Sequence, residues 1–123
     1  MREMRTHKDL DVWKAAVQLA GRVYAVTRSF PAGERFGLVN QMRRAAVSIA
    51  SNIAEGAARQ TKKEFIQFLC VAAGSASELD TQIEISRLTG NGSSKDLDAL
   101  QSELERVSRM IQGLIGSLRN RDS

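Results

Sequence analysis

The stretch SKDLDALQSELERVSRMIQGLIGSL, residues 94–118, places apolar side chains at spacings that alternate between three and four. These positions are Leu97, Leu100, Leu104, Val107, Ile111, Leu114 and Leu118. The alternation gives a helix one continuous apolar face, because an α-helix makes two turns in about seven residues. The stretch therefore predicts a helix over residues 94–119 with one face against a core.

Three further segments carry the same helical spacing. Residues 62–89 place apolar or small side chains at Phe65, Leu69, Ala72, Ala76, Leu79, Ile83 and Ser86. Residues 34–56 do so at Leu38, Met42, Ala45, Ile49 and Ile53. Residues 11–29, with Phe30 just after them, do so at Val12, Ala16, Leu19, Val23, Val26 and Phe30. The chain is thus predicted to be all-α, with four helices.

Local signals mark the ends of these helices. Asp9 or Asp11 is a candidate N-cap of the first helix, and Pro31 ends it. Gly56 is a candidate C′ residue of the second helix, and Thr61–Glu64 is a capping-box sequence at the start of the third. Connections this short place consecutive helices antiparallel. We expect residues 1–123 to form one domain, an antiparallel up-down-up-down bundle that serves as a protomer of a homo-oligomer.

The supply of reactive side chains argues against an enzyme. The chain has one histidine, His7, and one cysteine, Cys70. Metal sites and nucleophile–base pairs usually need more of these residues, and a phosphate-binding loop needs a preceding strand that the pattern does not contain. We therefore expect a non-catalytic protein without cofactor or metal site.

No segment resembles a membrane anchor. The longest apolar stretch, residues 68–74, is far shorter than the roughly 18 residues that span a bilayer. The N-terminal residues are charged and lead into an amphipathic segment, unlike a signal peptide. Together with the single cysteine, this predicts a cytoplasmic protein with no membrane partner.

Positive charge is concentrated in the first half of the chain. The net charge of +4 divides into +7 for residues 1–63 and −3 for residues 64–123. Such asymmetry favours head-to-tail self-association or a polyanionic partner. The candidate contacts to nucleic acid are Arg2, Arg5, Lys8, Arg43, Arg44, Arg59, Lys62 and Lys63. An ordinary solvated surface is the alternative, and without aromatic interleaving any binding should be directed at the backbone and weakly sequence-specific.

A polar stripe accompanies the apolar face of the second helix. We expect a structural polar network at the contact of the second and third helices, made of Gln41, Ser48, Asn52, Glu55, Ser75 and Glu78. Small residues on both helices, such as Ala46 and Ala72, predict close packing there.

The expected pairing of these helices makes two further predictions. If the turn is centred near residue 59, Arg43 and Arg44 lie near Gly74 and Glu78, which predicts an ion pair with Glu78. Asn52 and Glu55 are expected to clamp the turn, with Arg59 within side-chain reach of the carboxylate. A direct functional role for the two is the minority alternative.

These residues coincide with a known pattern. The sequence resembles the four-helix-bundle family encoded in intervening sequences of large-subunit (23S) ribosomal RNA genes. The resemblance covers nearly the whole chain. Its most specific part is Ser51-Asn-Ile-Ala-Glu-Gly56, and further matches are Leu10–Trp13, Phe30-Pro31, Gly37-Leu38, Arg43–Ile49, Lys63–Phe65, Gly74-Ser75 and Glu78-Leu79.

The resemblance implies a small bacterial protein whose relatives form homopentamers. Similar bundles are the accessory variability determinant proteins of diversity-generating retroelements, which associate with nucleic acid and a reverse transcriptase. The first hypothesis is therefore a homopentamer that binds RNA or DNA electrostatically. The second is an assembly scaffold with a protein partner, such as a reverse transcriptase, and no direct contact with nucleic acid. Location inside a ribosomal RNA gene or beside a reverse transcriptase gene would separate the two settings.

Overall fold

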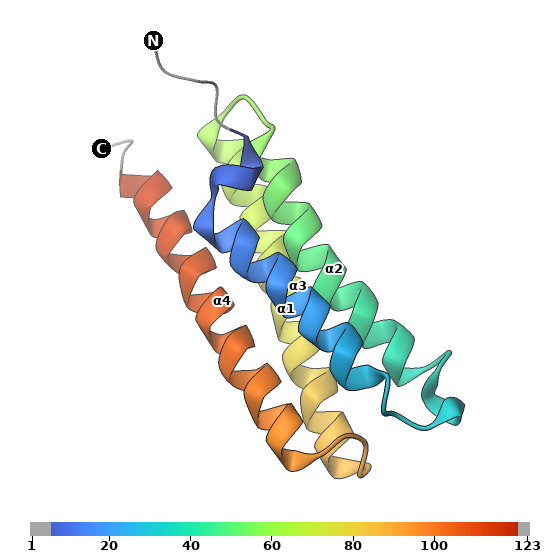
Figure 1. Cartoon of the computed structure of the whole chain (residues 1–123). Helices are drawn as coiled ribbons and strands as arrows, with labels where there is room; N and C mark the ends of the chain where they lie inside the picture. The colour runs from blue at the N-terminus through green and yellow to red at the C-terminus, as the bar shows by residue number, and fades with distance from the viewer. Residues whose placement is uncertain (1–5, 121–123) are drawn as a thin grey trace.

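The structure, a computed structural model, describes residues 6–120, and these residues form four long helices (Figure 1). The helices are α1 (Asp11–Thr27), α2 (Leu38–Ala57), α3 (Lys62–Leu88) and α4 (Ser94–Asn120). Two 3-10 turns, η1 (His7–Asp9) and η2 (Ala32–Glu34), precede α1 and α2. The chain is therefore all-α, as the spacing of its apolar residues predicts.

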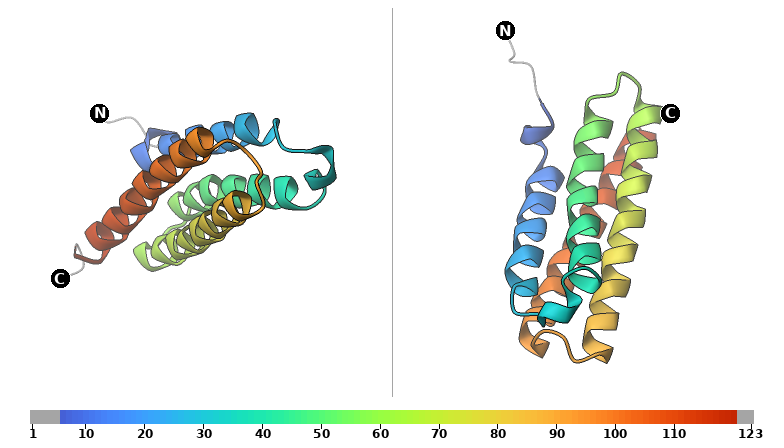
Figure 2. Two further views of the ribbon diagram at one scale, coloured as in Figure 1. Left: turned by 90° about the horizontal axis from the view of Figure 1, so that it is seen from below. Right: turned by 90° about the vertical axis from the view of Figure 1, so that its right-hand side faces the viewer.

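The helices form an up-down-up-down bundle (Figure 2). Each helix packs against the next one along the chain, and α4 returns to pack against α1. Within residues 6–120, no Cα atoms of the diagonal pairs, α1 with α3 and α2 with α4, lie within 8 Å of one another. The α2–α3 turn lies at the same end of the bundle as the beginning of α1 and the end of α4, and the other two connections lie at the opposite end (Figure 1).

The core consists mainly of aliphatic side chains from all four helices. Its fully buried large members are Leu19, Val23, Met42, Ile49, Ile53, Leu69, Leu79, Ile83, Leu97, Leu100, Val107 and Ile111. The sequence pattern places one α4 residue imperfectly, because Ile115 is 3% exposed whereas Leu114 is only half-buried. A straight helix drifts by about 20° per heptad from a strict seven-residue repeat, so the buried position moves by one residue towards the end of α4.

The first connection differs from the prediction. α1 ends at Thr27, where the buried hydroxyl donates to the Val23 carbonyl oxygen at 2.7 Å, well before Pro31. α2 begins at Leu38 and not at residue 34, because residues 32–34 form a 3-10 turn and Gly37 has a non-helical backbone. The two helices are thus shorter than predicted, at 17 and 20 residues.

Two predicted helix ends have different explanations in the structure. Neither Asp9 nor Asp11 is the N-cap of α1, which is Leu10, and the Asp9 carboxylate accepts a hydrogen bond from the Thr6 amide instead. Gly56 is not a C′ residue but a buried position inside α2. A Cβ atom there would lie 2.8 Å from the Cβ of Phe68. Gly56 therefore allows the first turns of α3 to approach α2 closely, which is a packing requirement and not a turn requirement.

The capping sequence before α3 is confirmed as an N-cap. The Thr61 hydroxyl oxygen accepts from the Glu64 amide at 3.1 Å and donates to the Glu64 carboxylate at 2.9 Å. Thr61 therefore fixes the first turn of α3.

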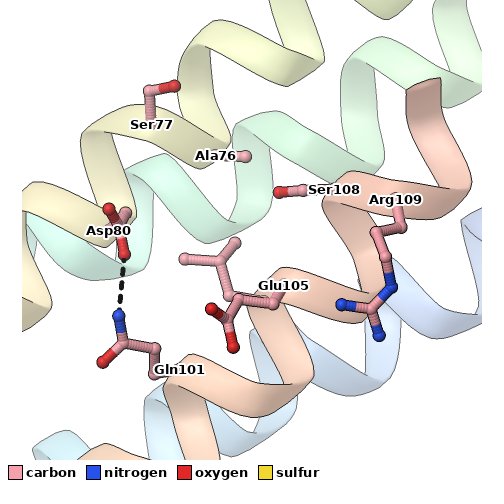
Figure 3. A pocket seen from close by; sticks show the side chains of 8 residues that line it. Ala76, Ser77, Asp80, Gln101, Glu105, Ser108 and Arg109 are labelled. Carbon is pink, nitrogen blue, oxygen red and sulfur yellow. Dashed lines mark hydrogen bonds between the residues drawn. The ribbon is translucent and has the colours of Figure 1, made fainter.

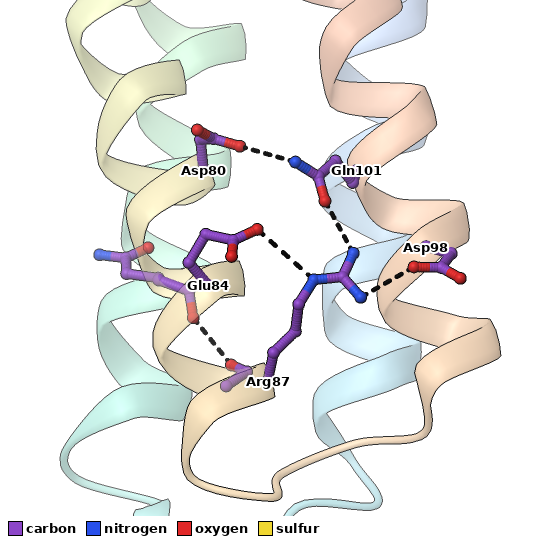
Figure 4. Close-up of polar contacts among 7 residues, drawn as sticks. Asp80, Glu84, Arg87, Asp98 and Gln101 are labelled. Carbon is purple, nitrogen blue, oxygen red and sulfur yellow. Dashed lines mark hydrogen bonds and ion pairs between the residues drawn. The ribbon is translucent and has the colours of Figure 1, made fainter.

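Polar contacts fix the opposite end of the bundle (Figure 4). The guanidinium of Arg87 on α3 donates to Asp98 at 2.8 Å and to Gln101 at 2.7 Å, both on α4. The buried Asn91 side chain donates to the Glu34 carboxylate at 3.1 Å and so connects the α3–α4 loop to η2. These contacts set the arrangement of the two connections at this end.

Candidate nucleic-acid interface

Several of the predicted basic residues gather at the end of the bundle that carries the α2–α3 turn. Lys62 and Lys63 begin α3 there, and Arg59 lies in the turn itself. Lys8 lies in η1, which packs against both α1 and α2 and so holds this lysine at the same end (Figure 1). All four side chains are exposed. We call Lys8, Arg59, Lys62 and Lys63 the basic end; the candidates Arg2 and Arg5 lie outside the described residues.

Arg59 of the basic end contacts side chains of both neighbouring helices, α2 and α3. Its guanidinium lies 3.3 Å from the Glu55 carboxylate and 4.8 Å from the centroid of the Phe68 ring. The predicted contact between Glu55 and Arg59 is thus present. The carboxylate offsets part of this arginine's charge.

Arg43 and Arg44 lie elsewhere, in the second turn of α2. The Arg43 guanidinium stacks 4.5 Å from the centroid of the Tyr24 ring and donates to the Thr27 hydroxyl at 3.0 Å. Arg43 therefore connects α2 to α1. The predicted ion pair with Glu78 was wrong: in the described part of the chain neither arginine is within ion-pair distance of Glu78, although Arg44 and Glu78 line the same hollow.

The register of α2 against α3 also differs from the prediction, although this shift does not separate Arg44 from Glu78. The prediction pairs positions whose numbers add to 118, whereas Ser48 meets Ser75 and Gly56 meets Phe68, so that the sums are 123 and 124. The first turn of α3 therefore extends past the end of α2. Each α2 residue faces an α3 residue about five positions later than predicted.

The predicted polar network is smaller than expected. The hydroxyls of Ser48 and Ser75 lie 2.8 Å apart across the two helices. The Asn52 amide donates to the Ser48 hydroxyl at 3.0 Å and to the Ser48 carbonyl oxygen at 2.8 Å. Asn52 thus bonds within α2 and does not clamp the turn, which corrects the prediction; Glu55 takes part in the turn through its ion pair with Arg59.

Two members of the predicted network make no hydrogen bond to the serine pair within residues 6–120, although Ser48 lines the same hollow. Gln41 and Glu78 are exposed and line a hollow of about 460 Å³ between α2 and α3. Gln82, which was not predicted, is a 7% exposed residue that also lines this hollow, and its Oε1 has no hydrogen-bond partner within residues 6–120. Its position three residues after the buried Leu79 is the signal that could have placed it on the inner face.

A second hollow, of about 370 Å³, lies between α3 and α4 (Figure 3). Its lining includes Asp80, Gln101, Glu105 and Arg109, and the Gln101 amide donates to the Asp80 carboxylate at 3.3 Å. This surface is more acidic than the basic end, as the charge asymmetry of the two halves predicts. Among residues 6–120, no three histidine, cysteine or acidic side chains are grouped so that they could hold a metal ion.

A known protein family shares the sequence pattern of this four-helix bundle. A family model described as 23S rRNA-intervening sequence protein matches residues 8–113. The chain belongs to this family. The match confirms the resemblance carried by the Asn-Ile-Ala-Glu-Gly segment, which contains Asn52, Glu55 and Gly56.

A solved structure shares the fold of this family member. It is a crystal structure of a protein with unknown function from the S23 ribosomal protein family of Bacteroides thetaiotaomicron, with a TM-score of 0.79 and 20% sequence identity. The alignment covers 85% of this chain and 95% of the Bacteroides chain. No curated protein matches the chain. No helix within residues 6–120 is both long enough and apolar enough to cross a bilayer.

Proposed function

We propose that the protein is a non-catalytic homo-oligomer, a pentamer, that binds the backbone of RNA or DNA through its basic end. The observation that carries this proposal is the gathering of Lys8, Arg59, Lys62 and Lys63, from two distant segments of the sequence, at one end of the bundle. The membership in a family named after an intervening sequence of 23S rRNA supports nucleic acid as the partner.

Self-association gives the basic end its binding strength. One copy offers only a few lysines, and an exposed charge contributes little by itself in physiological salt. Several copies that present the same lysines on one assembly create a stronger field and release more counterions from a nucleic acid. Binding should therefore depend on assembly, fall steeply with salt and show little sequence preference.

Fluorescence anisotropy with a structured RNA and a DNA duplex, at about 50 mM and about 150 mM salt, tests the proposal. The variant Lys8→Ala/Lys63→Ala removes two charges from the basic end. The control Arg28→Ala/Lys95→Ala removes two exposed charges from the opposite end of the bundle. We expect the first variant to bind several-fold more weakly than the control and to show a shallower salt dependence. Equal binding by both variants, or no binding by the wild type at about 50 mM salt, would contradict it.

The scaffold hypothesis makes the opposite prediction. An oligomer that holds a protein partner, such as a reverse transcriptase, would keep its assembly and ignore nucleic acid. A stable oligomer without RNA or DNA binding in this experiment would favour it, and the acidic hollow between α3 and α4 would then be the surface to examine first.

A further inference from the structure

An unpartnered apolar stripe runs along the outer side of α3. It consists of Val71, Gly74, Glu78, Thr81, Ile85 and Leu88, all exposed and spaced alternately by three and four residues. Val71, Ile85 and Leu88 are 52%, 43% and 89% exposed, so three large apolar side chains on one side of α3 face solvent. We call these six residues the α3 stripe. Their spacing is that of a helix seam that packs against a partner.

The other three members of the α3 stripe, Gly74, Glu78 and Thr81, are compatible with a contact surface. Thr81 donates its hydroxyl to the Ser77 carbonyl oxygen at 2.9 Å, so it offers no unpaired donor. Gly74 has no side chain, and a Cβ built there would meet nothing within 4 Å. Glu78 is the only charged residue of the α3 stripe. The stripe thus combines apolar anchors, a small residue for close approach and one negative charge.

A shallow groove of complementary character lies over α1 and α2. It is formed by two adjoining hollows of about 320 Å³ and 500 Å³, which share Val47. Its apolar lining includes Trp13, Val17 and Tyr24 from α1. Its remaining members from α2 are Asn40, Arg43, Arg44, Ser48, Ala50, Ser51 and Ala54, and Ala20 completes the α1 side. We call this surface the α1–α2 groove; its lining includes two arginines and no carboxylate.

We propose that the α3 stripe of one copy lies in the α1–α2 groove of the next copy, an inference that rests on the self-association proposed above. The charges agree, because Glu78 meets a groove that carries Arg43 and Arg44. The lengths agree as well: residues 71–88 span about 26 Å of helix, and the α2 side of the groove, residues 40–54, spans about 21 Å. Anchors repeated at helical spacing are the usual means by which a helix occupies such a groove.

A symmetric contact between two stripes fits the structure less well. It would bring two copies of Glu78 close together on an otherwise apolar surface, where like charges repel. A contact between two different surfaces has another consequence. The two end copies of an open assembly keep one free stripe and one free groove, so the contact does not stop at a dimer and gives a ring when the rotation between copies closes.

Complementation between variants tests this arrangement. The stripe variant is Val71→Glu/Ile85→Glu, and the groove variant is Val17→Glu/Val47→Glu; all four side chains are exposed, so the bundle should stay folded, as circular dichroism can check. The control Ala99→Glu/Gln112→Glu places the same added charge on exposed positions of α4. Light scattering coupled to size exclusion then gives the mass of each variant and of their mixture.

We expect the control to be oligomeric like the wild type and each of the other variants to be monomeric. An equimolar mixture of the stripe and groove variants should form a 1:1 heterodimer, because one intact stripe then meets one intact groove. Variants that remain oligomeric, or a mixture that remains monomeric, overturn the stripe-in-groove contact while leaving self-association intact. A wild-type monomer in the same experiment would overturn self-association itself.

Discussion

The hydroxyls of Ser48 and Ser75 lie 2.8 Å apart across the contact of α2 and α3, and Ser75 is only 5% exposed. The Ser48 hydroxyl oxygen also accepts from the Asn52 amide. Ser48, Ser75 and Asn52 therefore form one hydrogen-bonded group. It lies in the part of the bundle where small residues allow α2 and α3 to approach closely. Removing either hydroxyl takes a hydrogen-bond partner from the other, which is unfavourable where water has little access.

Ser48→Ala should destabilise the protein by about 1–3 kcal/mol, because the Ser75 hydroxyl and the Asn52 amide both lose a partner. The double variant Ser48→Ala/Ser75→Ala should be less destabilised than the sum of the two single variants, since no hydroxyl then remains unpaired. Urea unfolding at one protein concentration measures the four proteins of this cycle. Additive single effects would show that the two hydroxyls are not coupled.

Gly56→Ala should destabilise the protein by about 1–3 kcal/mol, because the added methyl group would meet Phe68 at 2.8 Å and Phe65 at 2.9 Å. Gly113→Ala on α4 is the matched control, since a Cβ there would meet nothing within 4 Å. That control should stabilise the helix by about 0.5–1 kcal/mol. Thermal unfolding of both variants should therefore shift in opposite directions, and a parallel shift would contradict the packing explanation of Gly56.

Asn91→Asp should destabilise the protein by about 1–3 kcal/mol, because it replaces the donor to the Glu34 carboxylate by a second carboxylate at a 5% exposed position. Glu34→Gln in the same chain should recover part of the loss, since it removes the repulsion and supplies an amide donor. Denaturant unfolding of the single and double variants measures this recovery. If Glu34→Gln lowers the stability of the Asn91→Asp variant further, these side chains do not join the α3–α4 loop to η2.

Arg87→Ala should destabilise the protein by about 1 kcal/mol, because its guanidinium bonds Asp98 and Gln101 but is itself 28% exposed. Arg87→Lys should recover only part of this, since an ammonium cannot reproduce both contacts of the planar group. The loss should be smaller at high salt, which screens the pair with Asp98. Unfolding of the wild type and both variants, at low and high salt, measures the stability of the three proteins. An equal loss of stability at both salt concentrations would contradict a contribution of the Arg87–Asp98 ion pair.

The sequence predicts the helices better than it predicts their contacts. The apolar spacing of residues 94–118 needs no partner to be recognised, and it places α4 correctly apart from the shift between Leu114 and Ile115. The predicted start of α2, near residue 34, was wrong because residues 32–34 form a 3-10 turn, whose composition resembles that of a first helical turn. Local propensity alone does not separate these two conformations.

Side-chain partners depend on the register between helices, which no single helix determines. The pairing of α2 with α3 was wrong by about five positions, and the side of α2 that carries Arg43 was also misassigned, since its guanidinium lies against Tyr24 and Thr27 on α1. The meaning of Gly56 was missed for the same reason, since the two phenylalanines that crowd it belong to α3. The basic end was only partly foreseeable, because η1 brings Lys8 to the α2–α3 turn through packing that the sequence does not reveal.

The placement of Lys8 and Lys63 at one pole of the bundle gives a rotationally symmetric assembly two unlike faces. When bundles meet side by side around an axis, rotation carries the same pole of each copy to the same face. One face then collects the lysines of every copy, and the other collects the connections that contain Glu34 and Asn91. Such a disc would adhere to a polyanion on one side only, and its other side would stay available to a different molecule.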